Sequence, residues 1–134
     1  MIYLPDTNVL IRFLNTGPSP VKTRLLSVDP KKIRLCSVVK AELYYGAMKS
    51  SKSAENMALL DEFFANFVSL PFDDDAAIKY GEVRSDLARL GTPIGPNDLM
   101  ISAIALVYGA IVVTHNSREF SRVKDLRIED WELV

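Results

Sequence analysis

The strongest constraint on the fold of this chain is that short apolar runs alternate with longer segments of helical periodicity. The strand-like runs hold three or four residues each and lie at residues 2–4, 33–36, 68–70 and 111–113, with a final extended segment at residues 127–134. Between them, apolar residues recur at the three- and four-residue spacing that is typical of helices. Short apolar strands joined by helices predict a parallel sheet covered on both faces. We therefore predict an α/β fold with three α/β/α layers and a mainly parallel central sheet of about five strands.

Length and composition limit the classes of protein that remain. With 134 residues, of which 49% are hydrophobic, the chain fits one compact domain over residues 1–134. The net charge of −1 provides no global positive field, so contacts with nucleic acid must be local. The N-terminus lacks the basic region of a signal peptide, and the longest apolar run, residues 101–114, is broken by Gly109 and too short to span a bilayer. We expect a cytoplasmic protein without membrane contact.

The chain has one cysteine, Cys36, and one histidine, His115. A single cysteine excludes an internal disulfide and a zinc site built on cysteines. Its apolar surroundings predict that Cys36 is a small buried hydrophobic residue. His115 falls next to the predicted functional edge described below, and we interpret it as a loop residue rather than a catalyst.

The first ten residues predict a strand, then an acid, then a helix. The apolar run at residues 2–4 leads directly to Asp6, Thr7 and Asn8, after which apolar residues resume at helical spacing. Asp6 would then lie at the carboxyl end of a strand, where open parallel sheets place their ligands. Helix capping explains the same residues, because Asp, Thr and Asn are all good N-caps. Both interpretations stay open at this point.

Further polar residues follow the other predicted strands. Ser37 is predicted to cap the helix after the second strand, and Glu42 lies just beyond the first turn of that helix. Asn116 and Glu119 follow the strand at residues 111–113, and Asp98 opens a helix that can point at the same edge of the sheet. Loops after parallel strands emerge at one edge, so we expect these side chains to converge on the carboxylate of Asp6.

Converging carboxylates favour a bound divalent cation. Like charges a few ångströms apart disfavour joint ionisation, and a hard cation relieves the repulsion. Mg²⁺ or Mn²⁺ takes carboxylate and water oxygens, and it can polarise a phosphoryl group and activate water for attack on a phosphodiester. The chain shows neither the Gly-x-Ser-x-Gly pattern of a serine nucleophile nor a phosphate-binding glycine loop.

The three consecutive aspartates at residues 73–75 have a structural interpretation instead. Acids at the N-terminus of a helix interact favourably with its dipole, so we interpret them as the cap and first turn of a helix at residues 76–90. Gly91 is the expected end of that helix. A second helix starts at Asn97 and Asp98, and Gly109 is its expected end.

Four motifs, in this order and at this spacing, resemble the successive motifs of PIN domains and, more narrowly, of the VapC toxins of bacterial toxin-antitoxin pairs. They are LPDTNVLI (residues 4–11), SVVKAELYYG (37–46), GPND (95–98) and THNSREF (114–120). The resemblance runs along nearly the whole chain and ends with RIEDW at residues 127–131. It implies a magnesium-dependent endoribonuclease that blocks translation and is inhibited by a cognate VapB-like antitoxin. It also implies pairing of the toxin with itself as a homodimer.

The resemblance also implies roles for individual residues. Asp6, Glu42 and Asp98 match the acidic metal site, with Asp6 and Asp98 as the direct ligands of Mg²⁺ or of Mn²⁺ in its place. Asn116 and Glu119 complete the catalytic group, and Thr7, Asn8 and Arg118 are assigned to the substrate. Arg12, Lys40 and Arg118 are candidates for phosphate contacts, although surface solvation explains such charges as well.

Two positions depart from the family pattern. Asn116 stands where many PIN domains have a fourth aspartate; its carbonyl oxygen can bind water or metal without adding charge, which argues against a second metal. Pro5 stands where these toxins carry an ordinary apolar residue, and because proline removes a backbone donor we expect it at the end of the strand.

Two other functions are alternatives to the nuclease. A phosphoryl-receiver-like module would need paired acids near residue 10 and a lysine after a late strand, and the sequence has neither. A catalytically silent PIN-like domain that binds RNA or a partner protein is favoured by Asn116 and the low net charge. The apolar residues 43–48 and 57–67 also exceed what one buried face needs, which predicts either core packing or a groove for a helix of the antitoxin.

Overall fold

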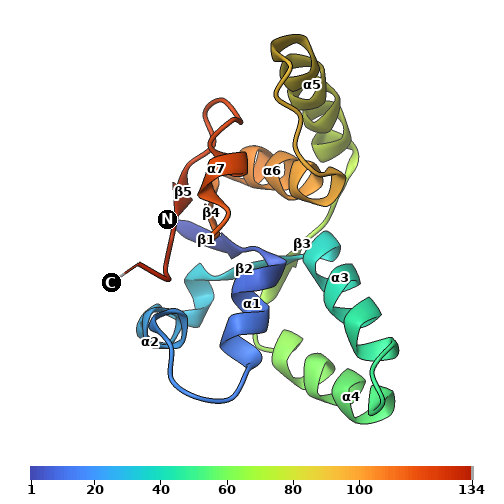
Figure 1. Ribbon diagram of the computed structural model, residues 1–134, viewed down its shortest axis with the longest axis vertical. Coiled ribbons are helices and arrows are strands. Elements are labelled where there is room, and N and C mark those ends of the chain that lie inside the picture. The colour runs from blue at the N-terminus through green and yellow to red at the C-terminus, as the bar shows by residue number, and fades with distance from the viewer. Residues whose placement is uncertain (134) are drawn as a thin grey trace.

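Five short parallel strands form the centre of the structure, a computed structural model that describes residues 1–133 (Figure 1). They are β1 (Ile2–Pro5), β2 (Arg34–Cys36), β3 (Val68–Leu70), β4 (Ala110–Val113) and β5 (Ile128–Glu129). β1 pairs with β4, β4 with β5, and β2 with β3. A parallel bridge between Tyr3 and Ile33 joins the two groups in the order β3-β2-β1-β4-β5. The predicted parallel sheet is confirmed, and of the predicted segment at residues 127–134 only Val134 lies outside the described residues.

Helices cover both faces of this sheet. The helices of residues 1–133 are α1 (Thr7–Leu14), α2 (Pro20–Ser27), α3 (Ser37–Met48), α4 (Ser53–Phe64), α5 (Asp74–Leu90), α6 (Pro96–Tyr108) and α7 (Ser117–Phe120), with a short 3₁₀ helix at Pro30–Lys32. Right-handed connections from β1 to β2 to β3 place α1 to α4 on one side, and the return from β3 to β4 places α5 and α6 on the other (Figure 1). The three predicted layers are confirmed. Across residues 1–133, none of the helices combines the length and hydrophobicity that crossing a membrane requires.

Most of the predicted helix ends are confirmed. Asp73 caps α5 by accepting a hydrogen bond from the backbone N–H of Ala76, and α5 and α6 end at Gly91 and Gly109 with φ angles of 70° and 68°. Glycine adopts this left-handed conformation without steric cost. The prediction that Ser37 caps α3 is wrong. Ser37 is the first helical residue, because Cys36 keeps the extended conformation of β2 and occupies the cap position without a side-chain hydrogen bond.

The two central strands form the core. Leu4 of β1 and Val112 and Val113 of β4 are fully buried, as expected for strands covered on both faces. Pro5 is the last residue of β1, as predicted, so its missing N–H removes no bond from the middle of the strand. Cys36 is also fully buried, as predicted, and burial raises the pKa of its thiol to about 11.

Candidate active site

Asp6 lies at the carboxyl edge of the sheet, directly after β1, and only 4% of its surface is exposed. Its Oδ1 accepts a hydrogen bond from the backbone N–H of Val9 at 2.9 Å and thereby caps α1. Its Oδ2 accepts one from the hydroxyl of Thr114 at 2.6 Å. Burial is the main cause that raises the pKa of Asp6, and the charge of Glu42 adds to the effect. Asp6 therefore caps α1 and also belongs to the acidic cluster, because its two oxygens bind different partners.

Thr7 connects the first helix to the second acid of the site. Its hydroxyl donates to Oε1 of Glu42 at 2.8 Å, although the two residues lie on α1 and α3. Because Asp6 already caps α1, the side chain of Thr7 is free to orient Glu42. Asn8 is exposed and lines the cavity beside Asp6.

Asp98 belongs to the first turn of α6 but does not cap it. The cap position is Gly95, which has no side chain to bind the helix, and Asp98 lies three residues further on. Its pKa is raised to about 6, first by burial and then by the negative charges of Asp6, Glu119 and Glu42. Four carboxylates that come from different elements thus act on one another at this edge of the sheet.

Asn116 connects two of these acids. Its amide Nδ2 lies 3.1 Å from Oε2 of Glu119 and 3.4 Å from Oδ2 of Asp98, and the hydrogen bond to Asp98 opposes the rise in the pKa of that residue. The sequence pattern predicted a role for the carbonyl oxygen of Asn116, whereas the structure turns the amide nitrogen toward the acids. Asn116 therefore relieves part of the repulsion that a fourth aspartate would increase.

The donor set fits a hard divalent cation. Within residues 1–133, none of the four acids Asp6, Glu42, Asp98 and Glu119 forms an ion pair, so their charges have no positive partner in the protein. Carboxylate and water oxygens are the ligands that Mg²⁺ and Mn²⁺ prefer. The ligand oxygens of Asp6, Glu42 and Asp98 are not all within 4.8 Å of one another, as expected for acids that repel each other.

The three basic residues proposed for phosphate contacts differ in their surroundings. Arg12 forms an ion pair with Glu132, with Nε and Oε1 at 2.8 Å, and the amine of Lys40 lies 5.1 Å from the centre of the Phe64 ring. Arg118 is exposed in the single turn of α7, beside Glu119. Arg12 lines the cavity beside Asp6 but is paired with Glu132, whereas Arg118 forms no ion pair with the other residues of 1–133 and keeps its charge available for a phosphate.

Thr114 is a residue of the site that the sequence interpretation missed. It is fully buried, donates to Asp6 and accepts a hydrogen bond from the backbone N–H of Asn116 at 2.9 Å. It thereby couples the end of β1 to the loop after β4. The signal was available in the sequence, because Thr114 directly follows a buried strand in the same way as Asp6.

The fold agrees with the comparisons to known proteins. The family model of the PIN domain matches residues 3–126. The tRNA(fMet)-specific endonuclease VapC of Salmonella typhimurium is 39% identical over 96% of this chain and 97% of its own, and the ribonuclease VapC2 of Rickettsia felis is 37% identical over 98% and 99%. The crystal structure of DNA-bound VapBC from Salmonella typhimurium matches with a TM-score of 0.90 and 38% identity over 98% of both chains. The chain therefore belongs to the PIN-domain family and, within it, to the VapC ribonucleases.

Proposed function

We propose that this protein is a metal-dependent endoribonuclease that acts as the toxin of a toxin-antitoxin pair, with Mg²⁺ as its cation. The observation that carries the proposal is the group of buried or half-buried acids at one sheet edge that, within residues 1–133, has no basic partner. Membership of the VapC ribonucleases supports a nuclease, since relatives of this chain are named as ribonucleases.

In this proposal each residue has a defined task. Asp6, Glu42 and Asp98 would hold the cation, which supplies the charge that polarises the phosphoryl group and lowers the pKa of the attacking water. Thr114 and Thr7 fix the orientation of Asp6 and Glu42 through hydrogen bonds of 2.6 and 2.8 Å. Such outer hydrogen bonds keep ligands in place and tune their affinity for metal.

The substrate side of the site consists of polar and basic groups around the acids. Asn8 and Asn116 line a cavity of about 590 Å³ together with Asp6, and Arg118 extends from the adjoining helix α7. We assign Arg118 to a phosphate of the RNA, and Asn8 to the sugar or base beside it. Single-stranded or looped RNA fits this open edge, because splayed bases can be reached there. The Salmonella relative is named as specific for tRNA(fMet), which makes a tRNA loop the first substrate to try.

The cleavage test uses purified cellular RNA with Mg²⁺ or with EDTA. We expect cleavage with Mg²⁺ only, and the rate should fall by about a hundredfold or more in Glu42→Gln because a carboxylate that holds the cation is lost. Glutamine keeps an oxygen that can accept the hydrogen bond from Thr7, so the fold should be preserved. Glu82→Gln on the exposed side of α5 is the matched control and should cleave like the wild type.

Two outcomes would contradict this proposal. Equal cleavage by Glu42→Gln and the wild type would mean that the acids are not the site. RNA binding without cleavage under all metal conditions would favour the silent PIN-like alternative, in which Asn116 in place of an acid leaves the site inactive.

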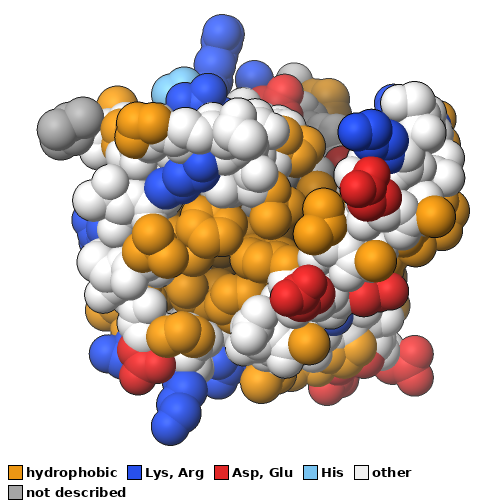
Figure 2. All heavy atoms as spheres, turned by 90° about the horizontal axis from the view of Figure 1, so that it is seen from below, with side chains coloured by type: hydrophobic (Ala, Val, Ile, Leu, Met, Phe, Trp, Pro, Cys, Tyr) orange, Lys and Arg blue, Asp and Glu red, His pale blue; other side chains and the backbone are white. Residues whose placement is uncertain are grey.

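An apolar hollow supports the proposed antitoxin partner. Figure 2 shows hydrophobic side chains gathered in a depression on the face seen from below, the side on which α1, α2 and α4 lie in Figure 1. Leu14 of α1 and Leu59 and the half-buried Phe63 of α4 line a groove, and Leu14 and Leu59 are 42% and 60% exposed. An amphipathic helix buries its apolar face in such a groove. We assign this groove to a VapB-like antitoxin. Of the apolar residues of α3, Tyr45 and Met48 are exposed as well, whereas Leu43 and Ala47 belong to the core.

The groove test compares two exposed apolar residues of similar accessibility. Leu59→Glu places a charge in the groove, so we expect the cognate antitoxin to bind at least about tenfold more weakly, as a central apolar contact is lost. Ile78→Glu on α5, where Ile78 is 64% exposed, should bind as the wild type does. Equal binding by Leu59→Glu and the wild type in a copurification assay would exclude this groove. Light scattering of the same samples tests the predicted homodimer.

A further inference from the structure

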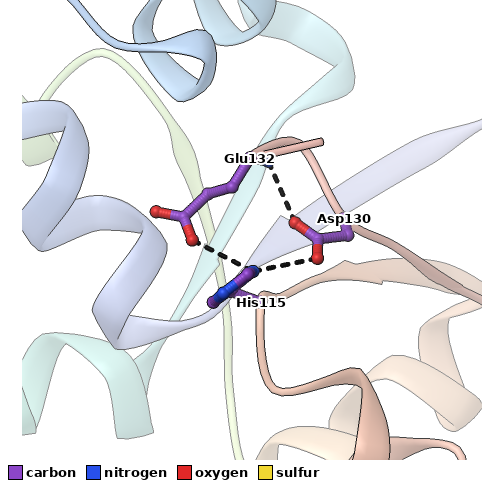
Figure 3. Close-up of side chains that lie close together, drawn as sticks. All are labelled: His115, Asp130 and Glu132. Carbon is purple, nitrogen blue, oxygen red and sulfur yellow. Dashed lines mark hydrogen bonds and ion pairs between the residues drawn. The ribbon is translucent and has the colours of Figure 1, made fainter. Parts of the chain in front are cut away.

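A second group of metal-ligating side chains lies beside the candidate active site and shares none of its acids. Nδ1 of His115 lies 3.0 Å from Oδ2 of Asp130 and 3.1 Å from Oε2 of Glu132 (Figure 3). One ligand atom from each of the three residues falls within 4.8 Å of the other two, and within residues 1–133 no other three His, Cys, Asp or Glu side chains meet this closely.

The sheet brings these residues together. β4 and β5 are adjacent parallel strands, and Val113 pairs with Glu129. His115 is the second residue after β4, and Asp130 directly follows β5. The loops after neighbouring parallel strands leave the same edge, so the contact follows from the register of the strands and not from the chance position of a surface side chain.

Both carboxylates are held in place by other bonds. Oδ1 of Asp130 accepts a hydrogen bond from the backbone N–H of Glu132 at 2.9 Å, and Oε1 of Glu132 lies 2.8 Å from Nε of Arg12. Each acid therefore uses one oxygen for its own orientation and turns the other oxygen toward His115. The acid side chains are only 12% and 18% exposed, which limits their movement.

His115 is the accessible member of the group. Its side chain is 64% exposed and lines the same cavity as Asp6, so an ion can reach the ring from solvent. Carboxylate oxygens of Asp130 and Glu132 lie 3.0 and 3.1 Å from Nδ1 of His115, so this nitrogen lies in a negative field. A cation is favoured at this point, whether it is a proton or a metal ion.

We propose that His115, Asp130 and Glu132 form a binding site for a first-row transition-metal dication, with Zn²⁺ as the ion that fits best. Zinc bonds of about 2.0 to 2.2 Å place the ligand atoms of a tetrahedral site roughly 3.3 to 3.6 Å apart. The two distances from Nδ1, 3.0 and 3.1 Å, are a few tenths of an ångström shorter, so a small outward movement of the exposed ring makes room for the ion. An imidazole ligand favours zinc and related metals over Mg²⁺. Three protein ligands leave the fourth position to water.

Metal at this site would join the loop after β4 to the segment after β5. That loop carries Asn116, next to His115, so the ion would stiffen one wall of the candidate active site without using its acids. The inference does not depend on the proposed nuclease function, and it can be tested without any measurement of RNA cleavage.

The experiment is calorimetric titration of the protein, free of any histidine tag, with Zn²⁺ in a buffer that contains millimolar Mg²⁺ to occupy the nuclease acids. We expect one Zn²⁺ per chain, and an affinity at least about tenfold lower for His115→Ala and for Glu132→Gln. Asp98→Asn is the matched control and should bind Zn²⁺ like the wild type. Because His115 is the only histidine, its ring proton signals provide a direct second readout by NMR and should shift on addition of Zn²⁺.

A variant that unfolds would have a lower melting temperature in EDTA. We expect His115→Ala to keep its fold, because the ring of His115 is exposed. The proposal is overturned if the wild type binds no Zn²⁺ or if His115→Ala binds it as tightly as the wild type. Loss of Zn²⁺ binding in Asp98→Asn with retention in His115→Ala would also overturn it, because the ion would then occupy the nuclease acids.

Discussion

The first turns of α5 and α6 both carry aspartates, yet the two helices use them in opposite ways. Asp73 at the start of α5 accepts hydrogen bonds from the backbone N–H of Ala76 and from the hydroxyl of Tyr108, and these bonds lower its pKa. Asp98 at the start of α6 is half-buried near other acids, and its pKa rises to about 6. An aspartate near the start of a helix is therefore a structural cap in α5, whereas in α6 it is a carboxylate whose ionised form is disfavoured.

The difference arises from what each helix N-terminus faces. A helix dipole favours an acid in the first turn at both places. At α5 the neighbours of Asp73 are hydrogen-bond donors, whereas at α6 the charges of Asp6, Glu119 and Glu42 act against the ionised form of Asp98. An acid whose pKa is raised by neighbouring charges is a better candidate for a functional residue than an acid that is paired with hydrogen-bond donors, because perturbed pKa values concentrate at functional sites.

The largest expected difference between the two helices is in the RNA cleavage rates of Asp98→Asn and Asp73→Asn. If Asp98 is a metal ligand, its replacement should lower the rate by about a hundredfold or more, since a weakly held metal ion loses part of the several kcal/mol by which it stabilises the transition state. Asp73→Asn should cleave at the rate of the wild type, because asparagine caps helices about as well as aspartate. Similar rates for the two variants would remove the distinction between the helices.

Metal binding can be measured without cleavage by thermal melts with EDTA and with Mg²⁺. The wild type and Asp73→Asn should gain about 2.7 kcal/mol of unfolding free energy at a hundredfold excess of Mg²⁺ over Kd. Asp98→Asn should gain much less, because one ligand of the proposed site is lost. Parallel responses of all three proteins to Mg²⁺ would contradict the assignment of Asp98 to a metal site, even if Asp98→Asn were inactive.

The smallest effect is the pH dependence of the metal-free protein, measured by urea unfolding in EDTA between about pH 4 and pH 8. A raised pKa means that the folded protein binds the proton of Asp98 more tightly, so the contribution of Asp98 is greatest at low pH and is lost as the pH rises through about 6. Above that pH, Asp98→Asn should be more stable than the wild type by about 1 kcal/mol. This is less than the free energy that corresponds to a pKa shift of about two units, because water still reaches the side chain and screens the charges.

Asp73 should show the opposite sign in the same experiment. Its lowered pKa stabilises the folded protein above the unfolded pKa, and this contribution is lost as the solution is acidified. Asp73→Asn should therefore flatten the acid side of the stability profile and bring no gain at neutral pH. A gain in stability for Asp73→Asn that equals the gain for Asp98→Asn would mean that the two aspartates are equally unfavourable in their ionised form.

Much of the fold and part of the site could be predicted from the sequence. The four central apolar runs, Gly91 and Gly109 as helix ends, and the position of Pro5 all follow from local rules of periodicity, glycine conformation and proline chemistry. The convergence of Asp6, Glu42 and Asp98 on one edge was expected because parallel strands end at one edge and the helix that begins near Asp98 can point at it. The roles of these residues in catalysis stay predictions that the cleavage and metal experiments test.

Other features depend on contacts between residues far apart in the sequence. The local sequence around each residue does not indicate that Thr114 donates to Asp6, that Asn116 turns its nitrogen toward Asp98, or that His115 contacts Glu132. The mistaken cap at Ser37 has the same origin, since pairing of β2 with β3 holds Cys36 extended until the helix begins.

The sequence by itself determined the order of strands and helices, the class of fold and the set of acids at the sheet edge, because hydrophobic periodicity and turn chemistry act over a few residues. Only the tertiary structure decided which partners each acid finds, such as the hydroxyl of Tyr108 for Asp73 and the amide of Asn116 for Asp98. Burial, hydrogen-bond partners and neighbouring charges set a pKa, and the charges that act on Asp98 come from the residue after β1, from α3 and from the segment after β4.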